Sequence, residues 1–362
     1  MMIYYNAQAR VKVEGNLSDP FDLGVGVLQG DTLAPFLFII VIDWVLRNAI
    51  PTEDLPFLGF QLTKPEGTKT RPTSEAKYLT DLDYCDDISL ISATLEGAQQ
   101  LLLNVEKWAL KVGLKINVPK TEFLAIGNWN TELNSPSGLN LCMSDGTRLN
   151  LVKNFRYLGS WIRDSTPDFK ARAAQSWTAV KKLRRLWTSK ILDNDVRKKF
   201  FYFLVVPISS YGSTAWTINK TLQNRIDSSF RRMYRYAQNI KWTEHIKNKD
   251  VFVNVTPASK LIARHRLRFI GHCWRSRLSA PQPVSDLLFW DAKSMGFKMK
   301  PGRRSNFRKL LLQETQCVDV QALKDLMDDR DAWIKHCDTI YPYADPFKDI
   351  KRKKTSRSQE IS

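Results

Sequence analysis

The sequence predicts an α+β fold, in which a mixed region with antiparallel strands precedes two regions that are mostly helical. Two observations predict it. Short apolar runs alternate with turn signals in the first 163 residues, and apolar residues recur at helical spacing after Thr166-Pro167. At 362 residues the chain is long enough for two or three domains. We expect a mixed region at 1–163, a basic helical region at 164–246, a helical C-terminal extension at 247–345 and a disordered basic tail at 346–362.

The mixed region should contain a buried helix, an amphipathic helix and short paired strands. Pro35 precedes an apolar stretch from Phe36 to Ile50, whose length favours a buried helix. Thr94 is the expected N-cap of the amphipathic helix, and Gly113 follows its end. We predict strands at 78–82, 88–92, 114–118, 123–126, 139–143 and 148–152, with a hairpin turn at Asp145-Gly146 and a closing segment from Phe155 to Ile162.

The charge of the chain points to a polyanionic partner. Lys and Arg number 55 against 37 Asp and Glu, which gives a net charge of +18. Such an excess favours nucleic acid first and an anionic membrane surface second. The longest apolar run, Phe36 to Ile42, is interrupted by Asp43 and is shorter than the ~20 residues that span a bilayer. No secretory signal is recognisable after Met1, so we expect no membrane association and a location in the nucleus or cytoplasm.

The cysteines favour a reducing compartment and give no zinc motif. Five cysteines are an odd number and are widely scattered. The adjacent pairs His272-Cys273 and His336-Cys337 lack the second half of a zinc-site spacing, so no zinc site is expected.

The strongest candidate for chemistry is the pair Asp86-Asp87. Neighbouring side chains on a strand point to opposite faces, so two adjacent carboxylates can serve one metal centre only where a turn breaks the alternation. Here they lie between two predicted short strands. Mg²⁺ prefers carboxylate oxygens, and nucleotidyl transfer commonly uses two such ions ~3.5–4 Å apart. The dipeptide alone is weak, since Asp328-Asp329 in the same chain is expected to be a solvated helix face.

The context of this pair resembles the reverse transcriptases of non-LTR, LINE-type retrotransposons. Four segments follow in that family's order: Gly26–Phe38, a Gln-Gly turn before a Pro-led helix; Leu79–Ile88, a (F/Y)xDD hairpin; Gly113–Asn117 followed by Lys120-Thr121; and Phe155–Gly159, similar to the hairpin that grips the primer. Arg268–Arg275 also resembles a stretch found after the thumb of such enzymes. The resemblance covers about Tyr4 to Ile246 and implies a partial right-hand palm followed by a helical thumb.

The resemblance implies roles for individual residues. Asp86 and Asp87 would be catalytic ligands of Mg²⁺ (or Mn²⁺), and Lys120 would donate a proton to the leaving pyrophosphate unless it is simply solvated. The partners would be an RNA template, a DNA primer and a dNTP. Residues near the dNTP and template would be Gln29, Gly30, Pro35 and Tyr84; the primer grip would be Phe155, Tyr157, Leu158 and Gly159, which can equally be ordinary strand core.

The sequence departs from the family pattern at two places. Cys85 stands where these elements usually have Ala, and we expect this small residue to be tolerated. The family's third metal ligand lies on a strand well before the Gln-Gly turn, and Met1 to Val25 does not match that strand. Asp19 and Asp22 flank Pro20 in an expected loop. We therefore expect an N-terminally truncated enzyme with negligible polymerase activity alone, or else a nucleic-acid-binding remnant of a decayed element.

Cations alternate with aromatics in the predicted thumb. We expect its tryptophans, Trp177, Trp187 and Trp216, to be core rather than base-stacking residues. Some of the cations should meet phosphates of the nucleic-acid backbone. The candidates are Lys181, Lys182, Arg184, Arg185, Arg231 and Arg232. The arginines between Arg264 and Arg304 extend the basic character, and Lys351–Lys354 is a nuclear-import signal, a nucleic-acid tether or a run without function.

Overall fold

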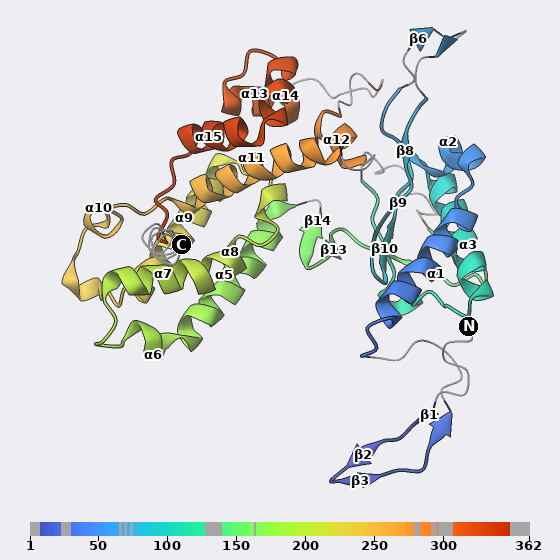
Figure 1. The fold of residues 1–362 in the computed structure, drawn as a ribbon, viewed down its shortest axis with the longest axis horizontal. Coiled ribbons are helices and arrows are strands. Elements are labelled where there is room, and N and C mark those ends of the chain that lie inside the picture. Colours follow the sequence, from blue (N-terminus) through green and yellow to red (C-terminus); the bar gives the residue numbers. More distant parts are fainter. Residues whose placement is uncertain are drawn as a thin grey trace, which may run out of the picture. The chain divides into compact units, whose positions relative to one another are not determined.

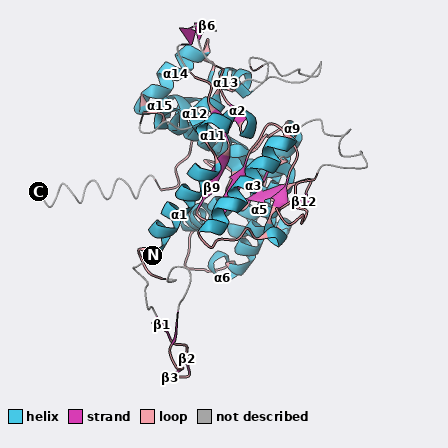
Figure 2. Cartoon of the chain, turned by 90° about the vertical axis from the view of Figure 1, so that its right-hand side faces the viewer, coloured by secondary structure: helices cyan, strands magenta, loops and turns pink. Residues whose placement is uncertain are grey.

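The computed structural model describes residues 8–22, 30–64, 67–68, 71–72, 75–126, 140–162, 164–278, 283–290, 295 and 307–347. The chain forms two compact units, Met1–Val152 and Lys153–Ser362. The segment from Phe155 to Ile162, which we expected to close the mixed region, therefore belongs to the second unit. Helices dominate the described residues, and the strands are short (Figure 2). The basic tail expected at 346–362 lies almost wholly outside the described residues.

Two helices form the core of the first unit. Helix α1 (Ala34–Ala49) packs against α3 (Leu95–Lys111), and a cluster around Leu46 and Val105 fills the space between them (Figure 1). A 3-10 turn, η2 (Thr52–Asp54), and the short helix α2 (Leu55–Leu58) follow α1. The predicted caps of the amphipathic helix are confirmed. Thr94 Oγ1 accepts a hydrogen bond from Gly97 N at 3.0 Å, and Gly113 adopts a φ of +79°, the left-handed conformation that ends helices.

Helix α1 has the predicted helical conformation, but the predicted burial holds for only part of its surface. Phe36, Ile39 and Ile40 are 66%, 51% and 63% exposed to solvent within the described part of the chain. Apolar composition predicted the helix, but it could not say which face the neighbouring elements cover. Among the described residues no single helix could cross a bilayer, and only α1 combined with Thr52–Leu58, bent by 59°, has the length and composition.

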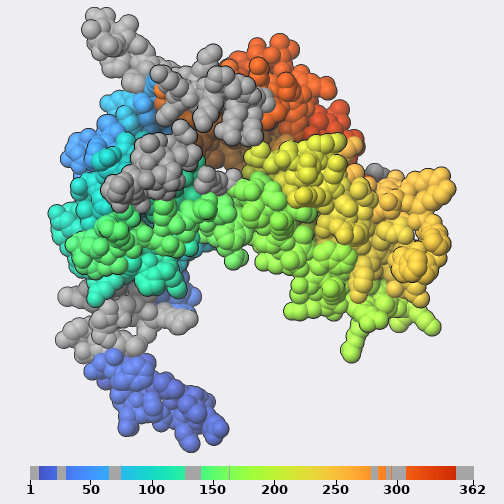
Figure 3. Space-filling model, turned by 180° about the vertical axis from the view of Figure 1, so that it is seen from behind, coloured from blue at the N-terminus to red at the C-terminus, as the bar shows by residue number. Residues whose placement is uncertain are grey.

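The strands of the first unit pair two by two. Antiparallel pairs join β1 (Gln8–Ala9) to β4 (Phe21–Asp22), β2 (Lys12–Val13) to β3 (Asn16–Leu17), β5 (Phe60–Gln61) to β8 (Tyr78–Leu79), β6 (Gly67–Thr68) to β7 (Arg71–Pro72), and β9 (Asp81–Tyr84) to β10 (Asp87–Leu90). One pair is parallel, β11 (Glu122–Phe123) with β12 (Asn150–Leu151). The β1–β4 ribbon is exposed along its length and is blue in Figure 3.

The strand predicted at 114–118 was wrong, and the one at 123–126 is shorter than expected. Leu114 and Ile116 lie in irregular backbone and pack onto the core of α1 and α3, and a 3-10 turn, η3 (Val118–Lys120), follows. Pro119 lacks the N–H that a ladder would need. The turn at Asp145-Gly146 is confirmed, because Met143 N donates to Thr147 O at 2.9 Å and Gly146 has a φ of +85°.

The second unit begins with a hairpin and continues as helices. Its elements up to the predicted end of the thumb are β13 (Phe155–Tyr157), β14 (Ser160–Ile162), α5 (Ser165–Lys182), α6 (Arg184–Trp187), α7 (Asn194–Leu204), α8 (Val206–Ser209), η4 (Ser213–Ala215), α9 (Lys220–Ala237) and η5 (Trp242–Glu244). Trp187 and Trp216 are buried in the core of these helices, as predicted. Trp177 is half-buried at its edge, where its ring meets that of Tyr236.

The C-terminal extension is helical, as predicted. Its elements are α10 (Asn248–Val251), α11 (Ala258–Ser276), α12 (Pro283–Leu288), α13 (Phe307–Thr315), α14 (Val320–Asp328) and α15 (Arg330–Ile340). Helix α11 contacts α12, α14 and α15 along its length, and Trp333 of α15 is fully buried beside Leu267 (Figure 1).

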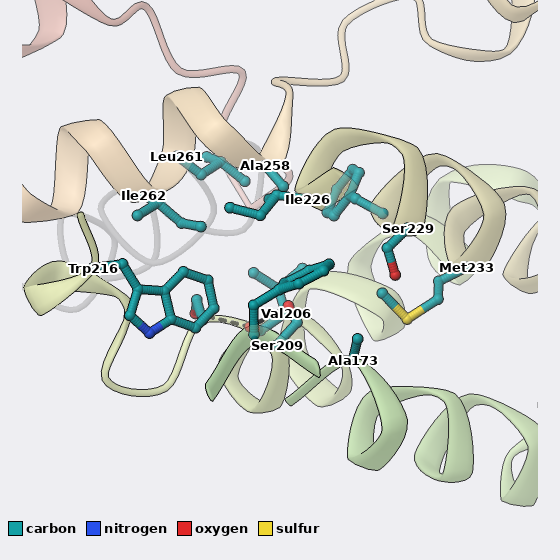
Figure 4. A pocket seen from close by; sticks show the side chains of 13 residues that line it. Ala173, Val206, Ser209, Trp216, Ile226, Ser229, Met233, Ala258, Leu261 and Ile262 are labelled. Carbon is teal, nitrogen blue, oxygen red and sulfur yellow. Dashed lines mark hydrogen bonds between the residues drawn. The ribbon is translucent and has the colours of Figure 1, made fainter. Parts of the chain in front are cut away.

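A small cavity lies among α5, α8, α9 and α11 (Figure 4). Its wall is mostly apolar, with Trp216, Ile226 and Ile262 facing the space. The volume of about 20 Å³ is enough for one water molecule but not for an organic ligand. The cavity is therefore a packing defect of the core, and the functional site must be sought elsewhere.

Candidate functional site

The carboxylate pair lies at the end of the β9–β10 hairpin. Asp87 pairs with Tyr84 and Ile88 with Asp83, which leaves Cys85 and Asp86 as a two-residue turn. Cys85 has a φ of +58°, the left-handed conformation that such a turn demands at its first position. Asp86 thus lies in the turn, and Asp87 is the first residue of β10. The turn breaks the strand alternation between the two carboxylates at the point where the sequence predicted it.

The two faces of this hairpin differ. Residues that pair across an antiparallel ladder share a face, so Asp83 lies on the side of Ile88, and Ile88 packs onto the core of α1 and α3 (Figure 1). Asp87 lies on the opposite side with Tyr84, whose side chain is 62% exposed. The helices therefore cover one face and leave the face of Asp87 toward solvent. Asp86 and Asp87 are both exposed.

A second acidic pair, which sequence reasoning did not single out, lies on the helix-covered face. Burial, the charge of Asp81 and a hydrogen bond with Asp81 together raise the pKa of the Asp83 carboxyl to about 7. Thr80 Oγ1 donates to Asp81 Oδ1 at 2.6 Å. The signal in the sequence was the Asp-x-Asp spacing, which places both carboxyls on one face of a strand.

The other residues predicted near the dNTP and the template are spread over the first unit. Gln29 lies outside the described residues. Gly30 has a φ of +91° just before α1, a conformation that favours glycine, and Pro35 is in the first turn of that helix. Lys120 is the exposed last residue of η3.

The predicted primer-grip residues form the β13–β14 hairpin. Phe155 pairs with Ile162 and Tyr157 with Ser160, so Leu158 and Gly159 make the turn, with φ values of +48° and +81°. The rings of Phe155 and Tyr157 stack on one face, with their centroids 6.2 Å apart. This hairpin contacts α5 of the second unit (Figure 1).

Residues 2–162 match the sequence profile of the reverse transcriptase family, described as RNA-dependent DNA polymerase. The chain contains a reverse transcriptase domain. Over 209 residues it is 29% identical to a putative uncharacterized transposon-derived protein of Caenorhabditis elegans, an alignment that covers 55% of this chain and 73% of the relative.

A further relative specifies the class of element. Over 129 residues the chain is 32% identical to the retrovirus-related Pol polyprotein from type-1 retrotransposable element R2 of Nasonia vitripennis. That alignment covers 35% of this chain but only 11% of the polyprotein. The reverse transcriptase domain is thus of the non-LTR retrotransposon type. Its β9–β10 hairpin lies within residues 2–162, the range that matches the family profile.

The helices that follow the reverse transcriptase domain form an open groove. Phe169 contacts Trp216 and Trp177 contacts Tyr236, so α5 and α9 run side by side in the same direction. The groove between them is lined by Phe169, Lys170, Ala173, Trp177, Thr221, Asn224, Arg225, Ser228, Ser229 and Arg232. Its lining contains three cations and no carboxylate.

Only one of the six predicted phosphate contacts lines this groove. Lys181, Lys182, Arg184, Arg185, Arg231 and Arg232 are all exposed, but Arg232 alone is a groove residue. Sequence reasoning missed Lys170 and Arg225. Their signal was positional: Lys170 precedes Trp177 by two turns of α5, and Arg225 precedes Arg232 by two turns of α9, so each pair shares a helix face.

The arginines on α11 and directly after it are paired within the protein. Arg264 and Arg268 both donate to Asp338, and Arg266 Nη2 donates to both carboxylate oxygens of Glu314 at 2.8 and 2.7 Å. Arg277 Nη2 donates to Asp328 Oδ1 at 2.6 Å. Four of the arginines that we expected to extend the basic character thus have carboxylate partners on α13, α14 and α15, whereas Arg303 and Arg304 lie outside the described residues.

The pair Asp328-Asp329 is also more than the solvated helix face that we expected. Asp328 Oδ1 accepts from Trp274 Nε1 at 2.8 Å. Asp329 caps α15 by accepting from the backbone N–H groups of Ala332 and Asp331, and these hydrogen bonds lower the pKa of its carboxyl. Within the described ranges, no three His, Cys, Asp or Glu side chains cluster closely enough to hold a metal ion.

Proposed function

We propose that this chain supplies the catalytic hairpin and the nucleic-acid-holding helices of a retrotransposon's RNA-directed DNA polymerase. The observation that carries the proposal is the position of Asp86 and Asp87 at the solvent-exposed tip of a hairpin whose other face packs on α1 and α3. In this proposal the first unit is the partial palm and α5 to α9 are the thumb. The reaction is attack of a primer 3′-hydroxyl on a dNTP, in the nucleus or the cytoplasm.

Asp86 and Asp87 would hold Mg²⁺ or Mn²⁺. The residues fit such an ion in part: both carboxylates are exposed and adjacent, and hard cations prefer their oxygens. When bound, the metal supplies activation of the attacking hydroxyl and neutralisation of charge on the leaving oxygen. Tyr84, on the face of Asp87, would border the nucleotide. Lys120 would hold the proton that the pyrophosphate takes up.

The groove between α5 and α9 would hold the backbone of the RNA–DNA duplex. Lys170, Arg225 and Arg232 are exposed and make no ion pair with the described residues, so their charges are available to phosphates. Because the groove lining includes no carboxylate, nothing in it repels the duplex. Phosphate contacts hold a duplex without reading its sequence, as a polymerase thumb must.

We further propose that these 362 residues by themselves have negligible polymerase activity. Asp86 and Asp87 lie at the tip of the hairpin, and in the part of the chain that the structure describes no third His, Cys, Asp or Glu joins them in a group that could hold a metal ion. Positioning and charge neutralisation supply most of the rate in phosphoryl chemistry. The second candidate function is accordingly a module that binds nucleic acid without catalysis, which the same groove supports.

Two measurements separate these functions. Binding of Mn²⁺ to the 362-residue chain, followed by electron paramagnetic resonance, should weaken at least tenfold in Asp86→Asn and in Asp87→Asn. Asp54→Asn, an exposed carboxyl on η2 of the same unit, is the matched control and should bind like the unchanged protein. Equal binding by all four proteins would remove the metal role.

The second measurement is extension of a DNA primer on an RNA template with Mg²⁺ and dNTPs. The chain alone should give none, and a longer polypeptide that adds an Asp-bearing strand before residue 1 should give extension that Asp86→Asn abolishes. Extension by the 362 residues alone would contradict the proposed inactivity. Failure of the longer polypeptide to extend, with duplex binding intact, would favour the binding module.

A further inference from the structure

The turn of the β13–β14 hairpin is held by side chains from two later segments of the second unit. Arg172 Nη2, on α5, donates to Gly159 O. Tyr211 Oη, in the loop between α8 and η4, donates to Leu158 O at 2.8 Å. Carbonyls at the two turn positions of a hairpin have no partner in the strand ladder and usually face water. Here both are bonded to side chains, so the end of the hairpin is fixed to the helices.

A buried network holds Arg172 in place. Its guanidinium lies 4.4 Å above the ring of Tyr211, and its Nη1 donates to Gln175 Oε1 at 3.0 Å. Its Nε lies 3.7 Å from Oδ1 of Asp168, a residue that is only 1% exposed. The other oxygen of Asp168 accepts from Trp216 Nε1 at 2.7 Å. A buried, partnered arginine has few alternative rotamers, so the donor that reaches Gly159 is preorganised.

The loop that carries Tyr211 is itself shaped to fit the hairpin. Gly212 has a φ of +68°, and a Cβ at this position would overlap the Ser160 hydroxyl of β14. Glycine adopts this left-handed conformation without strain and leaves room for the Ser160 hydroxyl. The hairpin, α5 and the Tyr211 loop therefore meet as one packed assembly within the second unit.

We propose that Arg172 and Tyr211 are positioning residues that lock the Leu158–Gly159 turn to α5, so that the primer end is placed by the thumb. This inference rests on the proposed function, and it adds the primer-gripping role that the family resemblance implies for the β13–β14 hairpin. Neither residue touches the reacting atoms. Their role is to hold the turn carbonyls, and with them the aromatic face of Phe155 and Tyr157, in one position relative to the α5–α9 groove.

The lock is tested first without nucleic acid, by hydrogen exchange of the full 362-residue chain. Arg172→Gln should raise exchange of the amides in 155–162 about tenfold, because a charged hydrogen bond and its buried partners are lost. Tyr211→Phe keeps the ring and removes only the hydroxyl, so a rise of severalfold is expected. Arg330→Gln, an exposed arginine on α15, is the matched control and should change nothing. Unchanged exchange in both Arg172→Gln and Tyr211→Phe would overturn the lock.

The positioning role is tested with an RNA–DNA duplex that carries a photoreactive base at the primer 3′ end. The unchanged chain should crosslink within 155–162. Arg172→Gln should lower that yield about tenfold while duplex affinity changes less than twofold, because the groove cations are untouched, and Arg172→Lys should restore part of the yield by donating to one carbonyl.

The outcomes separate this inference from the proposed function. Faster exchange in Arg172→Gln without any loss of crosslinking would make the contacts merely structural and overturn the positioning role. No crosslink to 155–162 in the unchanged chain would remove the primer grip from the proposed function and leave the lock standing. If Arg172→Gln does not fold, Tyr211→Phe carries both measurements.

Discussion

The indole of Trp333 on α15 occupies the space where a side chain at Gly271 would lie. A Cβ added to Gly271 would overlap this ring, and Trp333 Nε1 also donates to Leu267 O on the same helix at 2.9 Å. Helix α11 thus approaches α15 at a glycine, and the buried ring fixes how the two helices cross. The position belongs to the Arg268–Arg275 segment that the sequence singled out.

Replacing this glycine should disrupt the C-terminal extension. Gly271→Ala should lower its free energy of unfolding by roughly 1–3 kcal/mol, because the core around Trp333 has no room for a methyl group. Urea unfolding followed by tryptophan fluorescence would measure the change. Ala263→Gly, on the same helix away from this contact, should cost only about 1 kcal/mol from helix propensity. A gain in stability in Gly271→Ala, as helix propensity alone would give, would contradict the packing argument.

The hairpin turn makes a prediction at Cys85. Its φ of +58° penalises a β-branched residue, whereas Ala keeps a small side chain in the same conformation. Cys85→Val should therefore destabilise the β9–β10 hairpin by about 1–2 kcal/mol, and Cys85→Ala should be nearly neutral. Hydrogen exchange of the amides in 81–90 reports both. If Val is tolerated as well as Ala, the left-handed turn is not present in solution.

The stability of the same hairpin should depend on pH through Asp83. Burial and the neighbouring Asp81 raise the pKa of Asp83 to about 7, so the fold favours the neutral carboxyl. The contribution of Asp83 to the stability of the hairpin is fully present below pH ~4, the pKa of an aspartate in an unfolded chain. It is lost as the pH rises through about 7, the pKa in the folded chain. Because Asp83 is nevertheless exposed to solvent, screening will reduce the size of the effect.

This dependence is measured by hydrogen exchange of the amides in 81–90 between pH 5 and pH 8. The quantity compared is the difference in protection between Asp83→Asn and the unchanged chain. The unchanged chain should lose protection relative to Asp83→Asn as the pH rises. The described histidines, His245, His265, His272 and His336, all lie in the second unit, so a reading local to the hairpin avoids their titration. A constant difference across this range would contradict the raised pKa.

The groove makes a prediction about salt. Arg225→Ala should weaken duplex binding about equally for all sequences and should lower the slope of log affinity against log salt by about 1, because one phosphate contact is lost. Lys170→Ala and Arg232→Ala should behave alike. Fluorescence anisotropy between 50 and 200 mM salt gives the slopes. Arg330→Ala is the control. If the slope for Arg225→Ala is as steep as the slope for this control, the duplex does not bind in the groove.

The sequence predicted some parts of the candidate site and not others. The turn at Cys85-Asp86 was predictable, because strand signals on both sides of an acidic pair leave few alternatives. The groove was not, since the cations that line it come from helices about fifty residues apart, and charge clusters along the chain pointed to Lys181–Arg185 instead. Linear clustering of charge does not determine which helix faces end up adjacent.

The sequence alone determined the features that depend on neighbouring residues. Local patterns predicted the helix caps at Thr94 and Gly113 and the turns at Asp145-Gly146 and Cys85-Asp86, because hydrogen bonds and backbone angles within a few residues fix them. The family resemblance likewise rests on short motifs. Tertiary structure alone decided the partners. It covered one face of α1 and left another exposed, paired Arg266 with Glu314 across 48 residues, and joined the hairpin turn to Arg172. Such choices depend on which surfaces meet when the chain compacts, and no local pattern carries that information.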